Sequence, residues 1–208
     1  MHQVAPKQDL QKAHIVPFVA QLSIENVVIG NSVVAISQGA FANCTSLKNV
    51  TFGTSVSSIG ISAFSGCTSL KTITIPNTVA WIEMQAFADC TSLSSVTIGT
   101  SVTKIGEQAF YGCTALSSIT IPNNVEIIDY GAFTNCTSLK TVTIGTGVKR
   151  IGSSAFKNCT SLTSVTFRTY TGWVAGSKNF ANSNALASKA DAATYLKSTY
   201  VNYEWRRS

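Results

Sequence analysis

The chain has 208 residues, of which 45% are apolar and 12% charged, a composition typical of a folded domain with a substantial core and not of a disordered chain. The net charge is +6, but the lysine and arginine residues are scattered along the sequence, whereas nucleic-acid-binding proteins concentrate them in a patch. No apolar run approaches the ~20 residues of a membrane-spanning helix, so we expect neither a nucleic-acid partner nor membrane insertion.

Residues 1–20 are predicted to form an N-terminal flank that caps a regular array. The segment from 9 to 22 supplies apolar side chains to cover the first coil: Leu10, Ile15, Val16, Phe18, Val19 and Leu22. Lys7 and Lys12 precede a short apolar stretch that Pro17 interrupts, and no small-residue cleavage site follows. This is a poor match to a secretory signal, so no export signal is visible in the chain.

A short phrase, Cys-Thr-Ser-Leu or Cys-Thr-Ala-Leu, recurs with a spacing of 23 residues. It contains all six cysteines: Cys44, Cys67, Cys90, Cys113, Cys136 and Cys159. Counted from each cysteine, apolar residues recur at +3, +6, +8, +12, +15 and +20; from Cys90 these are Leu93, Val96, Ile98, Val102, Ile105 and Phe110. The same frame extends back to Ile24 and forward to Phe167. Residues 21–167 are therefore predicted to hold seven repeats, the first and last degenerate.

Each repeat predicts one coil of a solenoid. Residues +6 to +8 alternate with a period of two and are rich in β-branched side chains, which favours a strand, and the threonine at +7 should point outward. Glycine or proline at +9 indicates a turn, a second short strand follows, and an Ala-Phe pair leads a bend back to the next cysteine. Because one coil buries too little apolar surface to be stable alone, the coils must stack.

Residues 168–208 are predicted to form a C-terminal cap with a helix at about 185–200. One helix face would carry the apolar side chains of Leu186, Ala190, Ala193, Leu196 and Tyr200. The aromatic residues of this segment are expected to form the core of the cap: Trp173, Phe180, Tyr195, Tyr203 and Trp205.

The six equivalent thiols could in principle bind metal, form disulfides, act as nucleophiles or fill the bend. Zinc sites use closely spaced ligands from several directions, whereas these cysteines are 23 residues apart and point the same way. The strand spacing is too wide for disulfides between stacked cysteines, and neither histidine, His2 or His14, lies in the array to act as a base. We predict small buried side chains, each followed by a threonine whose hydroxyl bonds to the backbone of the bend.

Positions +14 and +17 differ between repeats and are expected to face outward, because the inward positions +12 and +15 are already occupied by valine and isoleucine. Large apolar residues occur there in the repeats that carry proline at +9, and polar or charged residues in most of the others, which gives a 46-residue super-period. Such a mixture of exposed aromatic, apolar and charged groups is typical of a contact surface. The candidate ligand-binding residues are Ile61, Trp81, Met84, Lys104, Glu107, Ile127, Tyr130 and Arg150.

The consensus CTSLxxVTIPxxVxxIGxxAFxxC resembles the BspA-like (treponemal, type 5) leucine-rich repeat over residues 21–167. The segment that begins TYTGWVAG is similar to the one that closes such arrays in some bacterial surface proteins. The resemblance implies a mainly β repeat solenoid, a right-handed leucine-rich-repeat coil with short parallel strands. It also implies a role in protein binding or adhesion and a location at the cell surface or outside the cell.

The leading functional hypothesis is a non-catalytic module that binds a protein, either of a host or a second copy of the chain, or else a glycan. The alternative is a structural component, such as a subunit of a surface fibre or virion appendage, which leaves homo-oligomerisation open. An enzyme is the third hypothesis, since Glu83 and Asp129 occupy the same repeat position two coils apart without an implied pocket. Neither a cofactor nor a metal site is expected.

Overall fold

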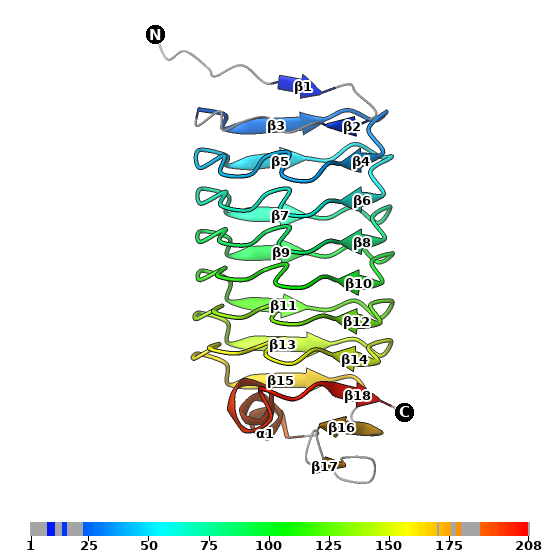
Figure 1. Ribbon diagram of the computed structural model, residues 1–208, viewed down its shortest axis with the longest axis vertical. Helices are drawn as coiled ribbons and strands as arrows, with labels where there is room; N and C mark the ends of the chain where they lie inside the picture. The colour runs from blue at the N-terminus through cyan, green and yellow to red at the C-terminus, as the bar shows by residue number, and fades with distance from the viewer. Residues whose placement is uncertain are drawn as a thin grey trace.

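The computed structural model shows a solenoid of stacked coils (Figure 1) and describes residues 8–10, 14–15, 23–169, 171–175, 178–179 and 188–207. Side chains are described from residue 23 onward, apart from 178–179. Each coil runs through a first strand, a turn, a shorter second strand and a bend, as the repeat predicts. The 23-residue repeat is the unit of stacking, because most paired residues of neighbouring coils are 23 apart in sequence.

The first strands line one side of the solenoid, which we call the first-strand face. Their bounds are β1 Gln8–Leu10, β3 Asn26–Ile29, β5 Asn49–Thr51, β7 Thr72–Thr74, β9 Ser95–Thr97, β11 Ser118–Thr120, β13 Thr141–Ile144 and β15 Ser164–Phe167. All their pairings are parallel, but they fall into three separate sheets: β1-β3-β5, β7-β9 and β11-β13-β15.

The second strands form the second-strand face, which is one continuous sheet of ten described strands. Its array members are β2 His14–Ile15, β4 Ala35–Ile36, β6 Ser58–Ile59, β8 Trp81–Ile82, β10 Lys104–Ile105, β12 Ile127–Ile128 and β14 Arg150–Ile151. The C-terminal strands β18 Trp205–Arg207, β16 Trp173–Ala175 and β17 Lys178–Asn179 continue this sheet beyond β14 in antiparallel pairings.

The apolar repeat positions form the core. The side chains at +3, +12, +15 and +20 are fully or almost fully buried in every described coil, and the alanine at +19 joins them. The phenylalanines at +20 stack from Phe41 to Phe156 with ring centroids 5.1–5.4 Å apart and interplanar angles of 3–11°. The threonines at +7 point outward, as predicted, with Thr51, Thr74, Thr97 and Thr120 exposed.

Two residues of each bend adopt a left-handed backbone conformation, in which residues other than glycine and asparagine are rarely found. The first is at +18, where Ser62, Gln85 and Gln108 have φ of 51–55°. The second directly precedes the cysteine and is always asparagine, aspartate or glycine. Backbone hydrogen bonds between successive bends, such as Phe64 N to Ala86 O at 2.8 Å, make this third side of the solenoid as regular as the second.

On the first-strand face, coils whose first strands pair with one another form a block of two or more coils. Within a block the N–H of Ile75 donates to the carbonyl of Thr97 at 2.8 Å, and an asparagine side chain, Asn77 Oδ1, accepts from Thr100 N at 2.8 Å. Between β5 and β7, and between β9 and β11, the strands are not paired, and Figure 1 shows them further apart. We call these two gaps the openings. Because the openings admit solvent, Val50, Phe52 and Val96 are only half-buried, although their positions predicted full burial.

The residue at +9 accounts for the openings. A Cβ on Gly99 would overlap the carbonyl oxygen of Pro76 and lie 2.8 Å from the oxygen of Ile75, so close stacking of these two coils requires glycine. Pro76 and Pro122 have a ring at this position, and each lies on the C-terminal side of an opening. Arg168 has a Cβ at the same position, yet its N–H donates to the carbonyl of Ile144 at 3.0 Å and its strand is paired. Proline has no N–H to donate, so each opening coincides with a proline at +9 and each paired step with a residue that keeps its N–H.

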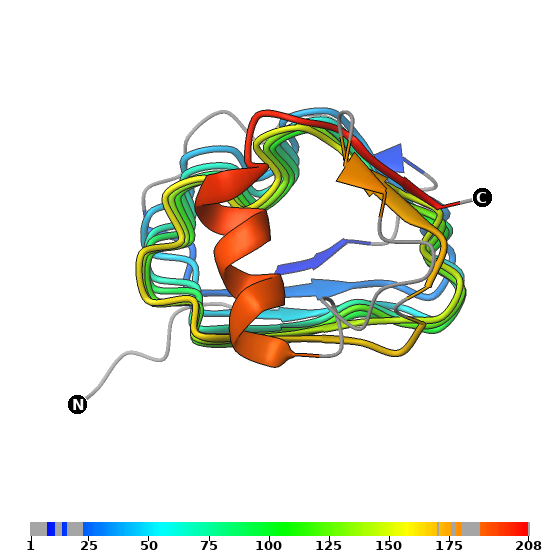
Figure 2. The ribbon, with the colours of Figure 1, turned by 90° about the horizontal axis from the view of Figure 1, so that it is seen from below.

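The C-terminal segment covers the last coil with a helix and strands. Helix α1, Lys189–Thr194, continues into the π-helical segment η2, Tyr195–Thr199, and lies across the end of the coils (Figure 2). Its contacts with the array include a hydrogen bond from Lys197 Nζ to the carbonyl of Leu162 at 2.6 Å.

Part of the predicted cap core is correct and part is wrong. Trp173 and Trp205 are buried and Tyr195 is half-buried, but Tyr203 is 51% exposed. In the helical segment Ala193 and Leu196 are buried as predicted. Ala190 is exposed and Ala192 takes its place, because the helix begins only at Lys189 and presents a different face to the last coil. The predictions for Val16, Phe18, Val19, Leu22, Phe180 and Leu186 lie outside the described residues.

Gly99→Ala should lower the free energy of unfolding by about 1–3 kcal/mol, because the added methyl group forces two closely stacked coils apart. The matched control is Pro122→Ala, which changes the same repeat position where a side chain is already accommodated and should cost less than ~1 kcal/mol. Urea denaturation followed by circular dichroism measures both. Equal effects of the two substitutions would contradict the steric role of the glycine.

Candidate functional site

The six thiols are free and fully buried. They do more than fill the bend, because five of them donate S–H hydrogen bonds to the preceding coil. The acceptor is the phenylalanine carbonyl 26 residues earlier, at 3.1–3.3 Å. Phe41 O, for example, accepts from Cys67 Sγ and also from the N–H of Cys44 in its own coil. The sequence prediction of a small buried residue is confirmed, and the hydrogen bond explains why alanine would be a poorer choice.

Burial also makes these thiols unreactive. It raises the pKa of Cys44 to about 11, with a contribution from the neighbouring Cys67, and raises the pKa of Cys159 to about 12. Since the thiolate is the nucleophile and the metal ligand, the raised pKa keeps Cys44 and Cys159 in the unreactive thiol form near neutral pH. Within the described residues, no three His, Cys, Asp or Glu side chains lie close enough together to hold a metal ion.

The hydroxyl of the threonine after a cysteine forms a hydrogen bond to the preceding coil and not within its own bend. The hydroxyls of Thr68, Thr114 and Thr160 donate to the carbonyl of the equivalent threonine in the preceding coil at 3.2–3.5 Å. The predicted hydroxyl–backbone bond is thus present, with its partner one repeat away.

The residues at +14 form a straight column on the second-strand face. Strand pairing places Ala35, Ser58, Trp81, Lys104, Ile127 and Arg150 directly beside one another in this order. Their side chains alternate with buried isoleucines at +15, so they point outward, and Trp81 is 50% exposed. Lys104, Ile127 and Arg150 are half-buried because each lies against its neighbours in the column.

The residues at +17 form a second column beside the first, at the start of the bend. Its members are Gln38, Ile61, Met84, Glu107, Tyr130 and Ser153. Five of their carbonyls, including those of Met84 and Glu107, accept an N–H from the preceding coil at 2.8–3.1 Å, which holds the column in place. Met84, Glu107 and Tyr130 are exposed and Ile61 is half-buried.

A chain of ion pairs runs along the C-terminal half of the +14 column. Asp129 lies between Lys104 and Arg150, at 3.4 and 3.5 Å, and Arg150 also pairs with Glu204 at 3.2 Å. Glu204 in turn contacts Arg206, and these two arginines hold its pKa below the usual value. The network attaches the C-terminal strand β18 to the array.

The repeat pattern did not indicate this role. Asp129 was predicted only as a possible catalytic partner of Glu83, whereas its carboxylate pairs with Lys104 and Arg150. The available signal was the cation at +14 in the coils on either side of Asp129. Val34, at +13, is a further exposed apolar side chain on the second-strand face that the repeat pattern did not single out.

Comparison with known proteins places the repeats in a family. The model of the BspA type leucine rich repeat region, in six copies, matches residues 17–113 and 82–192. The chain belongs to the BspA type leucine-rich repeat family. BspA type proteins are repeat solenoids, and the predicted fold and family are both confirmed. No curated protein matches the chain.

Among solved structures, a leucine rich repeat protein of Treponema pallidum is 26% identical with a TM-score of 0.55 and covers 66% of this chain and 77% of its own. A leucine-rich repeat protein from Bacteroides ovatus is 27% identical with a TM-score of 0.47 and covers 68% of this chain and 48% of its own. A leucine rich cell surface protein from Faecalibacterium prausnitzii is 25% identical with a TM-score of 0.36 and covers 80% and 67%. No described helix is long and apolar enough to cross a membrane.

The thiols should resist a disulfide reagent at pH 8 in the native protein and all react once it is unfolded in guanidinium. A thiol that is modified in the native state without unfolding would contradict their burial.

The raised thiol pKa values also predict a pH dependence of stability. Below the ordinary pKa of 9.0 the thiols are protonated in both states and their contribution is fully present. As the pH rises from 9 towards 11–12, the unfolded chain loses these protons first, so the free energy of unfolding should fall. A Cys44→Ala, Cys159→Ala variant should lose less stability over this range, by up to about 1.4 kcal/mol per pH unit for each thiol removed. Parallel pH profiles for the two proteins would contradict the assignment.

Proposed function

We propose that this protein is a non-catalytic binding module that recognises a protein partner through the +14 and +17 columns. The observation that carries the proposal is the clustering of Trp81, Met84 and Tyr130 as exposed side chains on one side of a rigid ladder. Large exposed aromatic and methionine side chains are enriched at the energetic centre of protein interfaces. Lys104 and Glu107 lie among them and supply charge of both signs.

The geometry favours a partner that lies across several coils. Trp81, Lys104 and Ile127 are neighbours in the strand register, so Trp81 and Ile127 are about 10 Å apart, at two strand spacings. Tyr130 follows Ile127 into the bend, next to Asp129, whose carboxylate accepts its N–H at 2.9 Å. Because the backbone ladder fixes these positions, little conformational entropy is lost when a partner binds.

Membership of the BspA type family supports binding as the general activity, since leucine-rich repeat solenoids are generally protein-binding and non-enzymatic. Adhesion and a location at the bacterial cell surface are part of the same proposal. A partner that is a second copy of this chain would make the protein a structural assembly component.

The double variant Trp81→Ala, Tyr130→Ala should lose at least about tenfold in affinity for a protein captured by the intact array, because two central aromatic side chains typically contribute more than 1 kcal/mol each. The matched control is Thr51→Ala, Thr74→Ala, which changes two exposed side chains on the first-strand face. Capture from a surface-protein extract, followed by titration of the purified partner, measures the effect.

Sedimentation of the protein alone provides the second readout. A homo-oligomer that the double variant dissociates and the threonine variant does not would identify the partner as a second copy. Equal binding and equal oligomeric state of all three proteins would exclude the two columns as the contact surface.

A further inference from the structure

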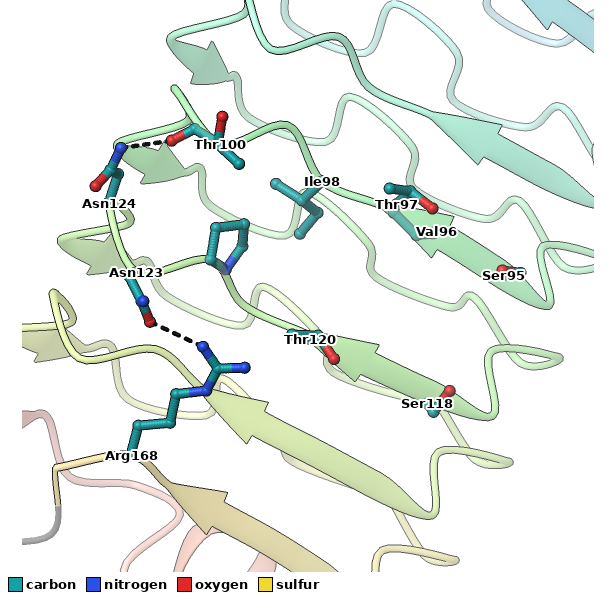
Figure 3. Close-up of a pocket in the computed structure, with 11 residues that line it drawn as sticks. Ser95, Val96, Thr97, Ile98, Thr100, Ser118, Thr120, Asn123, Asn124 and Arg168 are labelled. Carbon is teal, nitrogen blue, oxygen red and sulfur yellow. Dashed lines mark hydrogen bonds between the residues drawn. The ribbon is translucent and has the colours of Figure 1, made fainter.

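The opening between β9 and β11 is a cleft of mixed polar and apolar lining with a volume of about 590 Å³ (Figure 3). It lies on the first-strand face, whereas the columns proposed to bind protein lie on the second strands and the bend. Hydroxyl groups flank it on both sides: Ser95 and Thr97 on one strand, Ser118 and Thr120 on the other. Val96 and Ile98 lie between them, and Pro122 with Asn123 and Asn124 forms one end.

The cleft exposes main-chain groups that are paired elsewhere in the array. Ile75 N donates to Thr97 O, and Ile121 N donates to Thr143 O, both at 2.8 Å. Between residues 23 and 169, all of which the structure describes, the equivalent bond from Ile98 to Thr120 is not formed. The missing pairing leaves the N–H of Ile98 and the carbonyl of Thr120 without this partner at the cleft. Groups of this kind gain stability from a ligand that can donate and accept hydrogen bonds.

Arg168 provides a cation at the same end of the cleft. Its Nη1 donates to Asn123 Oδ1 at 3.2 Å, as Figure 3 shows, although the two residues belong to coils two repeats apart. Gly145 occupies the equivalent position in the coil between them and leaves room for the long side chain. Arg168 forms no ion pair with any carboxylate in the described part of the chain, so its guanidinium can accept an anionic group of a ligand.

The charge of the whole face matches an anionic ligand. The positions directly before and after the first strands carry four cations, Lys48, Lys71, Lys140 and Arg168, and one carboxylate, Glu25, which pairs with Lys48 at 2.7 Å. Four positive charges and one negative charge give a net +3 for the face. Such a local excess of positive charge attracts an anion and speeds its binding.

The same face lacks the anchors of a protein interface. The exposed large apolar side chains of the described chain are Val34, Trp81, Met84, Tyr130 and Tyr203, and none of them is on the first strands. Protein interfaces depend on a few such side chains at their centre. A cationic surface with hydroxyl, amide and main-chain groups and no large apolar anchor fits a carbohydrate better than a protein.

A similar cleft occurs at the opening between β5 and β7, two coils earlier. It is lined by Lys48, Asn49, Ser69, Lys71, Thr72 and Ser92, again hydroxyl and amide groups with cations. The two openings are two coils apart, which is at least about 10 Å and thus comparable with the length of a disaccharide unit in an extended sugar chain. One linear ligand could therefore contact both clefts.

We propose that the first-strand face binds an acidic oligosaccharide. A carboxylate or sulfate group of the sugar pairs with Arg168, and the sugar hydroxyls bond to the threonine and serine hydroxyls and to the free main-chain groups of the β9–β11 opening. The β5–β7 opening, with Lys71, takes the next acidic unit of the chain.

Calorimetric titration tests this with three probes of equal length: an oligogalacturonate, a sulfated heparin-derived oligosaccharide and a neutral cello-oligosaccharide. We expect binding of at least one acidic probe, at least tenfold tighter than the neutral one. Which acidic probe binds identifies the anionic group. No detectable binding of either acidic probe at millimolar concentration would overturn the proposal.

Two variants locate the site. Arg168→Gln should weaken binding of the acidic probe at least tenfold, and Thr97→Val, Thr120→Val should weaken it although no charge is removed. The matched control is Lys157→Gln, an exposed cation in the bend before Cys159, which should bind as the unmodified protein does. Thermal unfolding of each variant verifies that it is folded. Equal losses for Arg168→Gln and Lys157→Gln would show non-specific attraction and overturn the site.

Two further measurements separate this proposal from its competitors. Poly-glutamate of matched charge should bind at least tenfold more weakly than the acidic sugar, and equal affinity would favour an acidic protein segment and overturn the assignment. Trp81→Ala, Tyr130→Ala should leave sugar binding unchanged, so failure of the protein-binding proposal and failure of this one are distinguishable.

Discussion

The hydrogen-bond ladder between successive coils, in a 23-residue register, is the constraint on which the rest of the structure depends. It pairs each residue with its equivalent in the next coil, so an identical residue in every repeat becomes a continuous internal column. The stacked phenylalanines and the cysteines that donate to their carbonyls are two such columns. Because one coil cannot bury its own apolar face, the ladder and these columns together make the array stable.

The ladder is continuous on two sides of the solenoid and interrupted on the third. Along the second strands and the bends it continues from coil to coil, whereas on the first-strand face it opens at the coils that carry Pro76 and Pro122. The intact side holds the exposed aromatic residues at fixed spacing, as a protein contact surface requires. The interrupted side exposes hydroxyl, amide and main-chain groups beside unpaired cations, as a sugar site requires. One 46-residue alternation thus underlies two surfaces of different chemistry.

Much of the fold could be predicted from the sequence because the same residue types occur at the same positions in every repeat. The strand positions, the outward threonines, the buried cysteines and the +14 column all follow from one frame applied to every coil. The alternation of glycine with proline was also visible. Its consequence was not, because whether two coils pair depends on how the backbone and side chain at +9 meet the backbone of the preceding coil.

The C-terminal cap was less predictable because its sequence is not repeated, so no periodic pattern shows which of its residues face the core. Composition identified aromatic and helix-forming residues, but only the packing against the last coil decides that Trp205 is buried and Tyr203 exposed. The same holds for the ion pairs of Asp129 and Glu204, which join residues 75 apart in sequence through Arg150. Such contacts follow from tertiary structure, and no periodic signal marks them.

The central claim is that the first-strand ladder closes within blocks and opens between them. Residue-resolved amide hydrogen exchange by NMR tests it most directly. The account predicts that the amides of Phe52 and Ile98, at the openings, exchange at least about tenfold faster than those of Ile75 and Ile121 at the equivalent positions within blocks. Equal protection of all four amides would show a continuous ladder and contradict the account.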